Sequence, residues 1–202
     1  NVGTPTGLPY DTGSDDMHPC YLPCGDIVFV STRCRKGILC DGPDVLTSTV
    51  LYRMGPNGED PVPLSFNTVS EAAPSITGDG RILYTRWEYV DKGGSACKCL
   101  WAMRPDGSGS VDVFGSHIAH PTTFIDGREV PGQSGMTFAT GAPHMPLGVG
   151  SIVRIEPGRS PRLLSSMTNL TPDIETPDEV GYRIRRDGQW VLEQRGPLFC
   201  QP

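Results

Sequence analysis

Seven cysteines are the residues of this chain whose type and spacing could most directly do chemistry. Four of them lie between positions 20 and 40, a density more typical of an oxidising compartment than of the cytosol. Four clustered cysteines can pair in three ways, and structural zinc or reduced buried thiols are the alternatives to disulfides. The candidate disulfide residues are Cys20, Cys24, Cys34, Cys40, Cys97 and Cys99.

Neither group of cysteines forms the Cys-x-x-Cys-His motif that attaches a c-type haem. Three residues separate Cys20 from Cys24, and Gly25 stands where the histidine would follow. Only one residue separates Cys97 from Cys99, so their side chains would point to the same side of an extended strand. We therefore expect no haem to be attached covalently through this motif.

The four histidines are the next candidates for ligands. Asp16 and His18 lie two positions apart, so in a strand they could hold a metal cation together. Alternatively, the aspartate caps a turn and His18 bonds to a neighbouring part of the fold. His144 follows a proline near a strand end and could contact a haem or a metal, with a structural role as the alternative. His117 and His120 are expected to face solvent from a loop.

The run from Arg86 to Tyr89 combines an arginine with aromatic residues, as protein interface hot spots do. Arg86, Trp87 and Tyr89 are therefore interface candidates, and core packing is the alternative role of the two aromatic residues. The sequence contains no Gly-x-Ser-x-Gly elbow, no His-Glu-x-x-His and no glycine-rich phosphate loop. It carries no complete catalytic motif, which leaves open whether the chain is an enzyme.

Charge and hydropathy argue against two classes of partner. The net charge of −6 comes from 23 acidic and 17 basic residues mixed along the chain, so we expect no nucleic acid partner. No apolar run approaches the roughly 18 residues of a transmembrane segment. The chain starts at Asn1 instead of Met, which we interpret as a processed or truncated product.

The elements that must position these residues are short strands, because 25 glycines and 20 prolines interrupt the apolar runs. The strands repeat: residues 51–58 (LYRMGPNG) match residues 100–107 (LWAMRPDG), and residues 152–158 (IVRIEPG) are a looser copy. Each copy ends in a turn rich in proline and glycine. Another strand is expected after each turn, at residues 62–66, 111–114 and 162–165.

The first half of the unit repeats as well. Residues 16–29 align with residues 71–84, and residues 129–140 form a shorter third copy. Four strands in about fifty residues describe one blade of a β-propeller, with a solenoid or a sandwich of the same hairpins as the alternative.

We therefore predict an all-β fold, a partial β-propeller of about three four-stranded blades. The blades are expected at residues 16–70, 71–119 and 120–175, after an irregular lead-in at 1–15 and before a hairpin-like extension at 176–202. Closed propellers need four to eight blades, and exposed sheet edges tend to be paired or covered. We expect the chain to be a fragment of a larger propeller, or to be completed by partner chains.

Residues 85–91 (TRWEYVD) carry the most specific resemblance to a known family. Together with residues 16–33, 74–84, 139–144 and 150–153, they resemble the propeller domain of hydrazine synthase alpha-subunit-like proteins. The resemblance implies an extracytoplasmic protein (periplasmic, secreted or at the cell surface), of a kind often linked to c-type cytochrome domains. The namesake enzyme of the family makes hydrazine from nitric oxide and ammonia at a haem.

The chain departs from that family where the resemblance implies a haem pocket. A second histidine and an aromatic residue are replaced by Met145 and Val149, and only His144 is retained. We therefore expect a scaffold or interaction module of a larger, redox-linked assembly. Its partners would be other proteins or further domains of the same polypeptide. The alternative is part of a hydrazine-synthase-like haem enzyme, contributing His18 or His144 to a haem or metal held by another domain.

Overall fold

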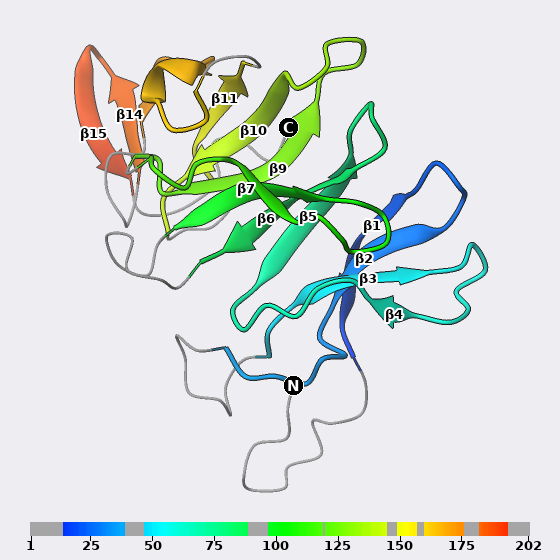
Figure 1. Cartoon of the computed structure of the whole chain (residues 1–202). Helices are drawn as coiled ribbons and strands as arrows, with labels where there is room; N and C mark the ends of the chain where they lie inside the picture. Colours follow the sequence, from blue (N-terminus) through cyan, green and yellow to red (C-terminus); the bar gives the residue numbers. More distant parts are fainter. Residues whose placement is uncertain are drawn as a thin grey trace, which may run out of the picture.

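The computed structural model describes residues 14–38, 47–88, 97–118, 120–144, 149–156, 160–175 and 182–193. Over these residues the chain is all-β, which confirms the predicted class at that level (Figure 1). The strands form open sheets of four, eight and three strands, and one short 3₁₀ turn interrupts them. Within the described ranges, no helix is long and apolar enough to cross a membrane.

The strands follow one another as antiparallel meanders, in which each strand pairs with the next one along the chain. The first meander consists of β1 (Asp16–Tyr21), β2 (Ile27–Ser31), β3 (Val50–Met54) and β4 (Val62–Pro63). The second consists of β5 (Glu71–Ile76), β6 (Ile82–Trp87), β7 (Lys98–Met103) and β8 (Val111–Phe114). The third consists of β9 (Thr123–Glu129), β10 (Thr137–Ala142), β11 (Ser151–Ile155) and β12 (Met167–Asn169).

Two further features complete the topology. A parallel pairing of Lys98 with Thr123 joins the second and third meanders into the eight-stranded sheet. The three-stranded sheet consists of β13 (Ile174–Glu175), β14 (Tyr182–Arg186) and β15 (Gln189–Glu193).

Turn chemistry sets the hairpins, as the sequence indicates. Asp187 and Gly188 both have positive φ angles, 49° and 79°, between β14 and β15. This is the signature of a two-residue type I′ turn. Gly107, at φ 84°, closes the turn between β7 and β8, and a Cβ atom there would lie 2.6 Å from the carbonyl oxygen of Leu64. Only glycine satisfies both the backbone angle and this close approach.

The first strand of each meander carries the same irregularity. His18 in β1, Ala73 in β5 and Asp126 in β9 all have left-handed backbones, with φ angles of 52°, 49° and 54°. The pairing register with the second strand shifts around each of them. A left-handed residue within a register shift marks a β-bulge, so the three meanders share one backbone device at equivalent places.

Alternating side chains place an apolar layer on each side of the second meander. Val28, Val30 and Leu51 of the first meander pack with Ile82 and Tyr84 of the second. All five side chains are buried, and each such burial contributes about 1.5–3 kcal/mol. Because these residues lie on both sheets, the first two meanders pack face against face.

The opposite face of the second meander packs against the third. Leu83, Leu100 and Phe114 contact Phe124 and Val153 there. The rings of Phe114 and Phe124 meet edge to face, with centroids 5.2 Å apart and planes at 77°. The second meander is therefore covered on both faces by its neighbours.

Two sequence expectations about the third meander are wrong. The strand expected at residues 162–165 overlaps a 3₁₀ turn at Leu164–Ser166, and β12 follows it. The third copy of the first half begins at Phe124 instead of Glu129, when Asp126 is aligned with His18 and Ala73. Seven residues (130–136) join β9 to β10, against five (77–81) between β5 and β6, and this longer loop displaces the alignment.

Candidate functional site

Several side chains that can act as metal ligands or hydrogen-bond partners lie together at the end of the β6–β7 pair. Arg86 pairs with Cys99, and Trp87 pairs with Lys98, across the two strands. The Glu88 N–H donates to the carbonyl oxygen of Cys97 at 2.9 Å and extends the ladder by one step. Because directly opposed residues share a face and neighbours alternate, Glu88 and the two cysteines lie on one side and Lys98 on the other.

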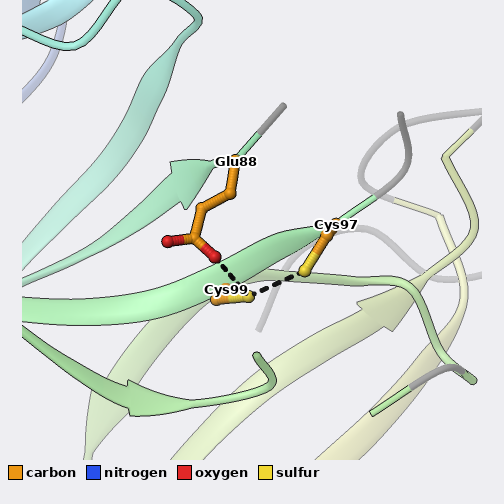
Figure 2. A group of neighbouring side chains, drawn as sticks. All are labelled: Glu88, Cys97 and Cys99. Atoms are coloured by element: carbon orange, nitrogen blue, oxygen red, sulfur yellow. Dashed lines mark hydrogen bonds between the residues drawn. The ribbon is translucent and has the colours of Figure 1, made fainter. Parts of the chain in front are cut away.

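Cys97 and Cys99 form a close pair of thiols on the first side (Figure 2). Their sulfur atoms are 3.2 Å apart, farther than the roughly 2.05 Å of a disulfide bond. The Cys99 thiol also donates to Glu88 Oε2 at 3.9 Å. Cys97 is 7% exposed and Cys99 is 0% exposed. A hydrogen bond with Cys97, then burial, raises the pKa of Cys99, so the proton stays on this sulfur at neutral pH.

These three residues offer one ligand atom each, and the three atoms lie within 4.8 Å of one another. Cys97 and Cys99 were predicted from their spacing to share a side, but Glu88 was not predicted to join them. Glu88 belongs to the run from Arg86 to Tyr89, and only the register of β6 against β7 shows that it lies on the side of the cysteines.

On the other side of β7, Lys98 contacts His144. The Lys98 Nζ atom is 2.5 Å from His144 Nδ1 and lies 4.7 Å from the centroid of the Trp87 ring. The Trp87 and His144 rings are 5.7 Å apart. His144, predicted as a candidate for haem or metal contact, is thus hydrogen-bonded to a buried lysine here.

Asp16 and His18, the predicted metal pair, have separate partners. The Asp16 carboxylate accepts from Arg33 at 2.5 Å and from Ser31 Oγ at 2.6 Å. Burial opposes its ionisation, but these hydrogen bonds outweigh burial and lower the pKa of Asp16. His18 Nδ1 accepts from the Ala73 N–H at 3.2 Å, across the boundary between two meanders. This contact is of the kind given above as the alternative, in which His18 bonds to a neighbouring part of the fold. The bulge at His18 interrupts the strand alternation that would otherwise place Asp16 and His18 on the same side.

The predicted disulfides do not form among the cysteines that the structure describes. The Cys34 thiol donates to the Ser48 carbonyl oxygen at 3.2 Å. The Cys24 sulfur lies 3.8 Å from an Arg53 nitrogen. These sulfurs have polar partners other than sulfur. The remaining described thiols are Cys20, Cys97 and Cys99, whereas Cys40 lies outside the described residues.

Two of the three predicted interface residues, Arg86 and Trp87, lie in the described part of the chain. Arg86 stacks on the Trp101 ring, with its guanidinium carbon 4.5 Å from the centroid. Trp87 is buried in a small cluster with Ile38 and Val69, which is the core role given above as its alternative. Tyr89 lies outside the described residues.

Two buried carboxylates escaped the sequence analysis. Glu71 is 1% exposed, and its Oε2 accepts from Ser65 Oγ and from the Leu51 N–H. Asp126 is also buried, 3.8 Å from Arg128, and stands at the bulge position that His18 occupies in β1. Burial raises the pKa of both carboxyl groups. Starting the third repeat copy at residue 124 would have aligned Asp126 with His18 and Ala73.

Comparison with known proteins yields a relationship of structure alone. No family model and no curated protein matches this sequence. Among solved structures, the chain is similar to hydrazine synthase of Kuenenia stuttgartiensis, with a TM-score of 0.61 and 15% identity. The similarity covers 83% of this chain but only 26% of the matched chain. At this identity, the chain shares a fold with part of that protein and is a distant structural relative of it.

Proposed function

We propose that this chain is part of a β-propeller that serves as an extracytoplasmic scaffold or interaction module in a larger, redox-linked assembly. The observation that carries the proposal is the face-to-face packing of three successive four-stranded meanders. Propeller blades are four-stranded sheets repeated around an axis, and each blade buries both faces against its neighbours. The second meander has this environment.

Contacts between the first strands of the meanders support a common axis. β5 lies beside both β1 and β9. Ser75 Oγ donates to the Gly127 carbonyl oxygen at 2.6 Å, and Arg128 donates to the Pro74 carbonyl oxygen at 3.2 Å. The bond from Ala73 to His18 repeats this link one meander earlier. In a propeller, the first strand of each blade lines the central channel, which would bring these strands together.

The three-stranded sheet supports a role in association. Trp190 and Val191 are adjacent in β15, so they point to opposite faces, and they are 41% and 38% exposed. An aromatic and an aliphatic side chain therefore face solvent on the two sides of one short sheet. β13 contributes only two residues to this sheet, so most of it is the β14–β15 hairpin. An isolated hairpin is marginal in water, and we assign further propeller blades as the occupant of these faces.

The test is the composition of the native assembly. The protein is tagged and purified under mild conditions, and its mass and its hydrogen exchange are measured in the complex and alone. We expect a mass well above that of the 202-residue chain and protection of β15 only in the complex. Trp190→Asp should release the chain from the assembly, whereas Val111→Asp, at an exposed residue of β8, should not. A monomer with no partner would refute the scaffold proposal.

The second candidate, a contribution to a haem held by another domain, rests on the fold shared with hydrazine synthase. The same preparation tests it. A haem absorption band that changes in a His144→Gln variant, but not in a His117→Gln variant, would favour a contact between His144 and the haem. An assembly without a haem band would exclude this role.

A further inference from the structure

The cluster of Glu88, Cys97 and Cys99 has a composition that scaffolding does not require. Two strands bring two thiols and a carboxylate to one place, with the sulfur atoms buried (Figure 2). We propose that these three residues bind one thiophilic divalent cation, with Zn²⁺ as the ion that this ligand set favours. Sulfur ligands select zinc over magnesium or calcium, and a carboxylate oxygen is a common additional zinc ligand.

The distances suit a shared tetrahedral ion. Zinc–sulfur bonds of about 2.3 Å at a tetrahedral angle place two thiolate sulfurs about 3.8 Å apart. A sulfur and a carboxylate oxygen on the same ion would be about 3.5 Å apart, given a zinc–oxygen bond of about 2.0 Å. The corresponding distances here are 3.2 Å between the sulfurs and 3.9 Å from Cys99 Sγ to Glu88 Oε2. These two distances change by about half an ångström on binding, within ordinary side-chain rotation. The third pair, Cys97 Sγ and a Glu88 oxygen, lies within 4.8 Å and must close toward about 3.5 Å.

A disulfide is the competing use of the same sulfurs. It requires the two atoms to approach by more than 1 Å, to about 2.05 Å, with a fixed dihedral angle. It would also remove the thiol proton that Cys99 donates to the Glu88 carboxylate. The three-residue arrangement is therefore better explained by a cation than by an oxidised pair.

The loaded site would carry a small net charge and keep one open coordination position. One Zn²⁺ with two thiolates and one carboxylate has a net charge of −1. The group has three members among the described residues, which leaves the fourth tetrahedral position to water or a small anion.

Zinc coordinates thiolates, so each cysteine that binds the ion must lose its thiol proton. The thiol protons pass to buffer as the zinc–sulfur bonds form, with no change of oxidation state. Calorimetry of Zn²⁺ binding at pH 7, in buffers of different ionisation enthalpy, should therefore report about two protons released per zinc.

The deciding experiment uses the reduced, metal-free full chain and titrates it with Zn²⁺ and with Co²⁺. We expect one ion per chain and a thiolate-to-cobalt charge-transfer band. Cys97→Ser and Cys99→Ser should each lose the band and weaken zinc binding by at least about 100-fold, and Glu88→Gln by at least about 10-fold. Cys24→Ser, at an exposed thiol on another meander, is the matched control and should bind as the parent does.

Three results would overturn the zinc proposal. An unchanged affinity in the Cys97→Ser, Cys99→Ser double variant would overturn the proposal, as would a parent chain without the cobalt band. A Cys97–Cys99 disulfide found by mass in protein alkylated without reduction would also overturn it. If a serine variant fails to fold by circular dichroism, Glu88→Gln and the cobalt spectrum of the parent decide the question. None of these readouts depends on the scaffold role.

Discussion

The substitution Gly115→Ala should test the side-chain packing between the second and third meanders. Gly115 follows β8 with a φ angle of 108°. A Cβ atom there would lie 2.6 Å from Phe124 Cδ2 and 2.9 Å from Cε2. Phe124 is fully buried and held edge-on against Phe114, so its ring has no free space into which it can turn.

The magnitude follows from two separate costs. A non-glycine residue at this positive φ costs about 1–2 kcal/mol. Overpacking a filled core adds about 1–3 kcal/mol, so the free energy of unfolding should fall by about 2–5 kcal/mol. Gly25→Ala is the matched control, because its φ angle is 95° and a Cβ atom there meets nothing within 4 Å. The control should lose only the backbone cost of about 1–2 kcal/mol.

Urea unfolding followed by tryptophan fluorescence measures both variants. The unfolding midpoint of Gly115→Ala should fall further than that of Gly25→Ala, with the slope unchanged. Adding Phe124→Leu to Gly115→Ala should recover part of the loss, with a coupling of about 0.5–3 kcal/mol. Equal losses in the two glycine variants, or no coupling to Phe124, would refute the packing between the meanders described here.

Three further predictions use buried polar groups. His18→Ala leaves the Ala73 N–H without its acceptor and should lower the free energy of unfolding by about 1–3 kcal/mol. The number of zinc ions bound per chain should not change, and a loss of zinc would contradict the placement of His18 away from the zinc ligands. Tyr84→Phe removes the 2.8 Å bond to Ser110 and should cost about 0.5–1.5 kcal/mol in urea unfolding; no loss would mean that water replaces this bond. Burial raises the pKa of Glu71, so the folded chain keeps this proton to a higher pH than the unfolded chain, and its stabilising contribution is lost as pH rises above about 4.5. Glu71→Gln should flatten this decline in urea unfolding series between acidic and neutral pH, and an unchanged profile would show that another group causes it.

The sequence predicted those features of the fold that depend on only a few adjacent residues. The Asp106-Gly107 and Asp187-Gly188 turns were readable because glycine at positive φ is a property of two or three adjacent residues. The all-β class followed from the same turns. The strand expected at 162–165 failed because residues 164–166 close into a 3₁₀ turn. The two leucines of this segment look like part of a strand in the sequence, but both are exposed in the structure.

The candidate site depended on register between strands, which local patterns do not encode. Glu88 reaches Cys97 only because β6 and β7 pair with Trp87 opposite Lys98. His144 meets Lys98 from 46 positions away, through the packing of the third meander against the second. Sequence spacing predicted that Cys97 and Cys99 share a side, but not which carboxylate would join them.

The shared bulge in the first strands has an evolutionary consequence. His18, Ala73 and Asp126 share one backbone conformation, although their side chains are basic, apolar and acidic respectively. The conformation is therefore imposed by the pairing of the strands and tolerates side chains of opposite chemistry. After duplication of an ancestral unit, each copy could change its charge at this position without losing its architecture. Such a position lets a repeated framework vary the chemistry of one side chain while its backbone stays constant.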